Sequence, residues 1–250
     1  MGSTKSKPYR SVNALEVKQN NARELKQNAS YELTYQLNTG SKISTYYINL
    51  DKRLDRRQQI EGELKRTNLV PYSRISGILN AEFGMLGCGL SHIKSLKQGI
   101  ESGADHILIF EDDFYFVMEP ELTQRIIQTV ILTNYDVFLL GYCVEDKELH
   151  THDTNNKLFK KIHKAQCCHG YMVSKRYAPK LLRNFEEGVN MLQKTKQIEK
   201  YACDVYWKRL QEEDMWVCAS SGPCGKQRAG YSDIVLHYKN ESITNIKEAF

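Results

Sequence analysis

The chain has 250 residues, enough for one or two domains with a sizeable core. Its 41% hydrophobic and 26% charged residues exclude collagen-like, low-complexity and disulfide-scaffold proteins. The apolar stretches fall far short of the roughly 20 residues that cross a bilayer. With 35 basic and 30 acidic residues the net charge is +5. The excess of positive charge is small and the basic residues are too spread out to indicate a nucleic-acid groove, so we expect no nucleic-acid partner.

The first residues, Met1–Ser6, fit the pattern for N-myristoylation of Gly2 and resemble the start of Src-type kinases. Lys5 and Lys7 lie close by. One acyl chain holds a membrane only marginally, and basic residues add attraction to anionic lipid, so this signal predicts reversible membrane association. The alternative is that Met-Gly-Ser is an expression remnant or a chance match.

The segment 1–40 is polar and rich in Asn, Gln, Lys and Ser. Such a segment buries too little apolar surface to offset its ordering entropy, so we expect an N-terminal extension here and one domain over 41–250. Leu15–Leu25 favours at most a short, weak helix. The β-branched and aromatic residues of Ile43–Leu50 predict a strand, and the charged amphipathic pattern of Leu54–Arg66 predicts a helix.

Strands and helices continue to alternate along the rest of the chain. The apolar run His106–Phe110 is typical of a strand buried within a parallel sheet. Further strands are predicted at Asp136–Leu140 and near Gly170–Val173, and helices at Gly87–Ile100, at about Arg176–Asn184 and at about Cys203–Glu212. The alternation predicts an α/β fold in which helices cover a sheet.

Three carboxylates, Glu111, Asp112 and Asp113, follow directly on a predicted strand. Open α/β sheets bind ligands beyond the carboxyl ends of their strands, so we expect these acids at the mouth of a site. Adjacent carboxylates repel one another, and Mg²⁺ or Mn²⁺ relieves the repulsion by bridging carboxylate and phosphate oxygens. The motif favours a metal-bound diphosphate as ligand. The alternative is that the acids only solvate the end of a strand.

A glycine-rich segment, Gly84–His92, leads into a predicted helix. Exposed N–H groups at a helix N-terminus attract anions, and glycine permits close approach. The segment lacks the lysine of a phosphate-binding loop and the spacing of a dinucleotide fingerprint. A packing turn with a core histidine at His92 is the competing interpretation.

Basic residues cluster after the first predicted strand, at Lys52, Arg53, Arg56 and Arg57. An arginine in the first helical turn at the carboxyl end of a strand can bind a phosphate through two hydrogen bonds, or hold the edge of a nucleobase. The alternative is a solvated helix face.

The seven cysteines show no regular spacing and no CxxC pair, which argues against both a disulfide framework and a structural zinc site. The adjacent Cys167 and Cys168 are expected to be buried thiols. No charged start leads into an apolar segment, so we expect no secretory signal peptide and a cytoplasmic location.

In chain order, these segments resemble glycosyltransferase family 25, which includes bacterial lipooligosaccharide galactosyltransferases and procollagen galactosyltransferases. The resemblance runs over about residues 43 to 234. It is carried by Tyr47–Leu50, Arg53, Arg56, Arg57, Gly87, Cys88, Leu90–His92, Ile109–Asp113, Gly170–Ser174, Leu181, Leu182, Asp204, Pro223, Gln227 and Ser232–Ile234.

This resemblance implies a GT-A fold, Rossmann-like with a mixed central sheet flanked by helices. It also implies inverting transfer of a hexose, galactose or glucose, from a UDP-sugar to a hydroxyl of a glycan or protein acceptor, with Mn²⁺ or Mg²⁺. By position, Asp112 and Asp113 correspond to the metal-binding acids of a DXD-like motif, and Asp204 to the catalytic base. Donor contacts are implied for Asn49, Leu50, Arg53, Arg56, Ser91, His92, Glu111, Asp112 and Gln227. The alternative for Asp204 is helix capping.

Two positions depart from the family pattern, because Met85 stands where glutamate is usual and Gly89 replaces a bulkier residue. The glycine-rich tract Ser221–Gly225 is expected to form a mobile flap near the donor. His237 follows it and is a candidate metal ligand, with an ordinary surface histidine as the alternative.

Two other functions fit parts of the pattern. A non-catalytic relative would bind a nucleotide-sugar or glycan and act as a membrane-tethered assembly factor. A metal phosphohydrolase would also use clustered carboxylates, but the chain lacks the histidine-rich ligand set of such enzymes. Because a signal peptide is not expected, the resemblance suggests a viral or bacterial protein, or glycosylation on the cytosolic face of a membrane.

Overall fold

The computed structural model describes residues 40–144, 151–234 and 237–239, the last three by their backbone alone. Nearly all of the expected N-terminal extension, with Gly2 and the weak helix at Leu15–Leu25, therefore lies outside the described residues. Within the part of the chain that is described, no helix is long and apolar enough to span a bilayer.

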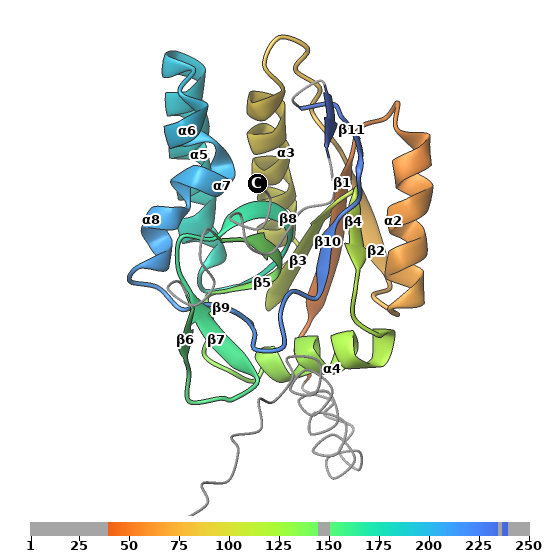
Figure 1. Ribbon diagram of the computed structural model, residues 1–250, viewed down its shortest axis with the longest axis vertical. Coiled ribbons are helices and arrows are strands. Elements are labelled where there is room, and N and C mark those ends of the chain that lie inside the picture. The colour runs from red at the N-terminus through yellow and green to blue at the C-terminus, as the bar shows by residue number, and fades with distance from the viewer. Residues whose placement is uncertain (1–39, 145–150, 235–236, 240–250) are drawn as a thin grey trace, which may run out of the picture. The chain divides into compact units, whose positions relative to one another are not determined.

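A mixed sheet of eight strands forms the centre of the domain, in the order β2-β1-β3-β8-β5-β9-β7-β6 (Figure 1). Its strands are β1 (Ile43–Asn49), β2 (Tyr72–Ser76), β3 (His106–Glu111), β5 (Val137–Cys143), β6 (Thr151–Asp153), β7 (Phe159–Ile162), β8 (Gln166–Ser174) and β9 (Trp216–Ala219). Strand β1 is parallel to β2 and β3, whereas β8 is antiparallel to β3 and β5. The predicted mixed sheet is confirmed, but β3 has a parallel partner on one side only.

Four long helices and three short ones accompany the sheet in the described part of the chain. They are α2 (Leu54–Arg66), α3 (Gly84–Glu101), α4 (Pro120–Val130), α5 (Ala178–Thr195), α6 (Ile198–Tyr201), α7 (Cys203–Tyr206) and α8 (Lys208–Gln211). Helix α2 has the predicted bounds, and α5 continues 11 residues beyond the predicted end at Asn184. The helix expected over Cys203–Glu212 is divided, because Trp207 separates α7 from α8.

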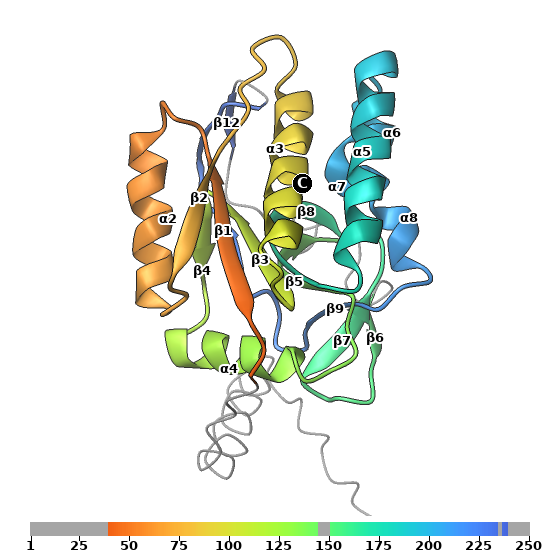
Figure 2. The ribbon, with the colours of Figure 1, turned by 180° about the vertical axis from the view of Figure 1, so that it is seen from behind.

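Alternate side chains of β3 enter two separate apolar layers. Ile107 and Ile109 pack with residues of α3 and α5, while Leu108 and Phe110 pack with residues of α2 and α4. This is the period-two alternation of a strand that is buried on both faces. Figure 2 shows α3 and α5 side by side across one face of the sheet. The flanking helices agree with the predicted architecture.

Two small ribbons complete the described chain and lie near the end of β3. Strand β4 (Phe114–Phe116) pairs with β10 (Gly225–Gln227), and β11 (Gly230–Ser232) pairs with β12 (His237–Lys239). Both ribbons are antiparallel, and the first one brings Gln227 level with Phe114, close to the three acids that follow β3.

The glycine-rich segment before His92 lies inside a helix, which corrects the expectation of an approach loop. Helix α3 begins at Gly84, three residues before the predicted start. A Cβ added at Gly87 would lie 2.3 Å from the carbonyl oxygen of Ile78, and one added at Gly89 would lie 2.6 Å from a methyl of Val189 in α5. These glycines allow a loop and a second helix to approach α3 closely.

Candidate active site

A pocket opens beyond the carboxyl ends of β1 and β3. Because these strands are parallel neighbours, with Ile48 paired to Glu111, the residues that follow them emerge at the same edge of the sheet. The space between the atoms, including the part open to solvent, is about 680 Å³. Its lining comprises Ile48, Asn49, Leu50, Arg56, Gly77, Ile78, Leu79, Asn80, Gly84, Cys88, Ser91, His92, Glu111, Asp112, Asp113, Gln227, Ser232, Asp233 and Ile234.

Asp112 is the most enclosed of the three acids and is fully engaged by neighbours. The amide of Asn49 donates to its Oδ2 at 2.7 Å, and Nη1 of Arg56 donates to its Oδ1 at 3.1 Å. Its exposed fraction is 7%. Burial raises the pKa of Asp112, while Arg56 and Asn49 favour its charged form. The same Arg56 nitrogen lies 3.2 Å from Asp113, so one arginine pairs with two adjacent carboxylates and offsets one of their two negative charges.

Gln227 lies between the other two carboxylates. Its Nε2 donates to Oε2 of Glu111 at 3.2 Å and to Oδ1 of Asp113 at 3.4 Å. An N–H donor there occupies the position between two carboxylates that a cation would take. The oxygens of Glu111 and Asp113, with the amide oxygen of Gln227 after a half-turn of that group, form a set of hard donors that suits Mg²⁺ or Mn²⁺.

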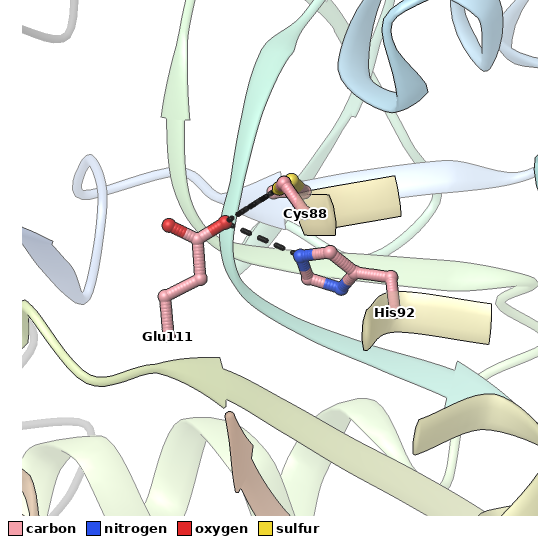
Figure 3. Close-up of side chains that lie close together, drawn as sticks. Cys88, His92 and Glu111 are labelled. Carbon is pink, nitrogen blue, oxygen red and sulfur yellow. Dashed lines mark hydrogen bonds and ion pairs between the residues drawn. The ribbon is translucent and has the colours of Figure 1, made fainter. Parts of the chain in front are cut away.

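His92 forms an ion pair with the opposite side of Glu111 (Figure 3). Its Nε2 lies 3.2 Å from Oε1 of Glu111, and its Nδ1 lies 3.1 Å from the hydroxyl of Tyr171. Burial opposes a charge on His92, but the hydrogen bond with Cys88 and the Glu111 carboxylate outweigh it and raise the pKa. Burial also opposes the charge on Glu111, and His92 again prevails, so the pKa of Glu111 is lowered. His92 is therefore a buried core residue and also lines the pocket, so both interpretations of this histidine hold.

Ser91 lines the pocket, and its hydroxyl is committed to a neighbouring loop. The backbone N–H of Ile78 donates to Oγ of Ser91 at 2.8 Å, while that hydroxyl donates to the carbonyl of Gly87 at 2.7 Å. Together with the close approach that Gly87 permits, this contact fixes the loop that forms one wall of the pocket.

Arg53 lies outside the pocket lining and pairs with acids on two segments. Its guanidinium donates to both oxygens of Asp55 and, at 2.6 Å, to Asp233. Lys52 also pairs with Asp233, at 2.7 Å, and Nη2 of Arg56 donates to the carbonyl of Tyr231. These contacts hold Ser232–Ile234 over the pocket, where all three residues line it. A direct donor contact of Arg53 stays a prediction.

The tract Ser221–Gly225 does not take the position expected of a flap. Cys224 is fully buried in the core, and a Cβ at Gly225 would lie 2.1 Å from the ring of Phe114. The tract packs against β4, and the segment that lies over the pocket is the later one that contains Asp233.

Asp204 is the second residue of α7, after the N-cap residue Ala202. Its Oδ2 accepts the backbone N–H of Cys167 at 3.1 Å. Burial raises its pKa. Asp204 is not part of the pocket lining. The side chain of His237 lies outside the described residues, so its metal role stays a prediction.

The structure also brings together cysteines that no sequence spacing connects. Cys88 of α3 and Cys168 of β8 both direct their sulfur at Oε1 of Glu111, at 3.9 Å and 3.3 Å. Cys168 is buried as predicted, whereas Cys167 is half-buried. Eighty positions separate the two thiols, and they become neighbours through the packing of α3 on the sheet and the pairing of β3 with β8.

Comparison with known proteins gives one family match. The model of glycosyltransferase family 25 (LPS biosynthesis protein) matches residues 82–195, just under half of the chain. No curated protein matches. Among solved structures, A197 from STIV is similar with 14% identity and a TM-score of 0.43, covering 81% of this chain and 96% of that one. The mannose-1-phosphate geranyltransferase from Thermus thermophilus has 10% identity and a TM-score of 0.43, covering 71% and 73%.

The matched segment contains α3, β3 and β8, and with them Cys88, His92, Glu111 and Asp113. Asn49, Arg56, Asp204 and Gln227 lie outside it. The family match supports a glycosyltransferase enzyme, with sugar donor and acceptor as its partners.

Proposed function

We propose that this chain is a metal-dependent, inverting glycosyltransferase that moves a hexose from a UDP-sugar to a hydroxyl of a glycan or protein acceptor. The observation that carries the proposal is the convergence of Glu111, Asp113, Gln227 and Arg56 in one pocket beyond the carboxyl ends of β1 and β3. Open α/β sheets bind nucleotides at this edge. Carboxylates with a neighbouring arginine suit a ligand that brings both a cation and a diphosphate.

The oxygen donors of Asp113, Glu111 and Gln227 are the residues that would hold Mn²⁺ or Mg²⁺. When bound, the ion neutralises charge that develops on the diphosphate leaving group. Asp112 is better suited to orient Arg56, because Asn49 and Arg56 already engage both of its oxygens. Arg56 can then offer N–H groups to a phosphate while Asp112 holds its guanidinium in place.

Asp204 is the proposed base. Inversion requires a carboxylate that takes the proton of the acceptor hydroxyl as its oxygen attacks the anomeric carbon and the bond to the diphosphate breaks, with UDP as the leaving group. A half-buried carboxylate with a raised pKa suits this task. Since Asp204 lies outside the pocket lining, the acceptor hydroxyl must approach from the side of α7.

Donor turnover tests the proposal without a known acceptor. The purified protein is incubated with UDP-, GDP- and CMP-sugars, with Mn²⁺ or with chelator, and slow release of free nucleotide is measured. We expect release from one UDP-sugar, lost in chelator and in Asp113→Asn. Asp105→Asn is the matched control, because Asp105 precedes β3 and lies at the opposite end of the strand. Its release is expected to equal that of the wild type.

Two other outcomes would contradict the proposal. If no donor is turned over and none binds in a metal-dependent way, the chain is a non-catalytic relative. If inorganic phosphate is the product, the chain is a phosphohydrolase. The role of Asp204 as the base is tested separately with Asp204→Asn. This variant is expected to lower kcat for transfer by about 10²–10⁴-fold while donor binding is retained.

We also propose that acylation of Gly2 brings this activity to a membrane surface. The support is the sequence of Met1–Ser6 alone. Intact mass after co-expression with an N-myristoyltransferase tests it, with Gly2→Ala as the control. An unmodified Gly2 would contradict the proposal.

A further inference from the structure

Four metal-binding side chains meet beneath the pocket. Cys88 and His92 come from α3, Glu111 from the end of β3 and Cys168 from β8, and their ligand atoms all lie within 4.8 Å of one another. Cys88 and His92 are four residues apart and so lie on one face of their helix. Figure 3 shows both side chains directed at the same oxygen of Glu111.

The separations resemble those within a tetrahedral zinc shell. Oε1 of Glu111 lies 3.2 Å from Nε2 of His92, 3.3 Å from Sγ of Cys168 and 3.9 Å from Sγ of Cys88. In a tetrahedron with metal–nitrogen and metal–oxygen bonds of about 2.0 Å and metal–sulfur bonds of about 2.3 Å, neighbouring ligand atoms are roughly 3.3–3.8 Å apart. The other separations are up to 4.8 Å, so the side chains need to close by roughly 1 Å at most to enclose an ion.

The surroundings suit such an ion. The hydroxyl of Tyr171 lies 3.1 Å from Nδ1 of His92 and fixes the imidazole with Nε2 toward the cluster, as an outer partner of a metal-bound histidine does. A third thiol, Cys203, lies 3.5 Å from Cys168. Cys88, His92 and Glu111 also line the pocket, which gives an ion a path to the cluster.

We propose that Cys88, His92, Cys168 and Glu111 form a binding site for Zn²⁺, which would make the sequence-based expectation of no structural zinc site wrong. Thiolate and imidazole ligands favour Zn²⁺ over Mg²⁺ and Mn²⁺. Binding releases three protons to solvent, one from each of the two thiols and one from Nε2 of His92, which holds it in the ion pair with Glu111. The ion links α3 to β3 and β8 under the floor of the pocket.

Glu111 is common to this site and to the hard-donor site of the proposed function. Its Oε1 faces the thiols and His92, whereas its Oε2 faces Gln227. Asp113 and Gln227 take no part in the zinc shell. A substitution of Asp113 or Gln227 therefore tests sugar transfer without removing a ligand of the zinc shell.

Metal content and cobalt spectroscopy test the site on the full chain. We expect the purified protein to retain about one zinc ion per chain. After removal of zinc by a chelator, Co²⁺ should produce a thiolate-to-cobalt charge-transfer band. Cys168→Ser is expected to weaken zinc binding by more than about 100-fold, beyond the 10–100-fold cost of losing an outer partner. Cys224→Ser is the matched control, because Cys224 is an equally buried thiol in the other apolar layer.

A second ligand variant, Cys88→Ala, keeps the test valid if Cys168→Ser misfolds. Circular dichroism of both variants shows whether each is folded. Absence of zinc together with absence of the charge-transfer band would overturn the proposal, as would equal affinities in both ligand variants and the control. Asp113→Asn is expected to keep the cobalt band. If the band appears while no donor is turned over, the zinc site holds and the proposed function fails. If a donor is turned over while no band appears, the proposed function holds and the zinc site fails.

Discussion

Nη1 of Arg53 lies 2.6 Å from Oδ2 of Asp233, although the two residues are 180 positions apart in the sequence. The pair joins the start of α2 to the segment that lies over the pocket. Both side chains are largely withdrawn from solvent, with exposed fractions of 18% and 10%. The family resemblance implies that Arg53 contacts the donor. In the structure Arg53 instead pairs with Asp233, which lines the pocket and lies near the other end of the chain.

Asp233→Asn should loosen this segment and raise the KM for the donor. Loss of the contact with Arg53 is expected to cost about 1–2 kcal/mol, a factor of roughly 5–30 in KM, with kcat less affected. Steady-state kinetics of donor turnover measure it. Asp153→Asn, an exposed acid with a distant lysine partner, is the control and should match the wild type. An unchanged KM in Asp233→Asn would show that the pair does not shape the donor site.

Arg56→Ala should destabilise the fold, because it leaves the buried carboxylate of Asp112 without a counterion. We expect a loss of about 3 kcal/mol in the free energy of unfolding, measured by urea denaturation. Arg57→Ala removes an exposed pair with Glu61 and should cost much less. In the Asp112→Asn background the cost of Arg56→Ala should fall. Equal costs in both backgrounds would contradict the coupling.

Gly87→Ala should be destabilising, because its methyl group would lie 2.3 Å from the carbonyl oxygen of Ile78. The overpacking cost is about 1–3 kcal/mol in the free energy of unfolding. Gly62→Ala is the matched control: Gly62 also lies within a helix, and no atom lies within 4 Å of the added methyl. It should stabilise the protein by about 0.5–1 kcal/mol. Similar effects of the two substitutions would show that the loop moves away at little cost.

Stability should decrease with acidification through His106. Burial lowers its pKa, and its Nδ1 lies 2.6 Å from the hydroxyl of Tyr135. The folded chain keeps His106 neutral where the unfolded chain binds a proton, so this contribution is present above about pH 6.5 and is lost as the pH falls through the lower pKa of the folded state.

Urea denaturation between about pH 7.5 and pH 5 checks this expectation. His106→Gln should flatten the dependence of the free energy of unfolding on pH, without abolishing it, because the pKa of His163 is lowered as well. Gln128→Asn, at an exposed side chain that does not titrate, is the control. An unchanged slope in His106→Gln would contradict the prediction.

The sequence predicted local elements best where one pattern dominated. The charged amphipathic stretch of α2 gave the observed bounds, and the apolar run of β3 gave its position. The short strands β6, β7 and β9 were missed because they have only three or four residues, too few for a period to register. The start of α3 was placed late, since Gly84 and Gly87 are poor helix formers and their place in the helix depends on what packs against them.

Much of the pocket was predictable for a related reason. Asn49 and Glu111 end the strands β1 and β3, Asp112 and Asp113 follow β3, and parallel strands place such residues at a common edge. Their individual partners were not predictable. Arg56 pairs with Asp112 and Asp113, and Gln227 lies between Glu111 and Asp113, only because α2 and β10 pack beside the end of β3.

The sequence by itself determined which chemical groups are present and the strand ends on which many of them lie, because side-chain type and hydrophobic period are local properties of the chain. Only the tertiary structure decided which of those groups meet. Cys88, Glu111 and Cys168 become neighbours through the packing of α3 on the sheet and the pairing of β3 with β8, and Arg53 reaches Asp233 across the pocket. Contacts between residues far apart in sequence arise when the chain buries its apolar faces, and spacing along the chain does not encode them.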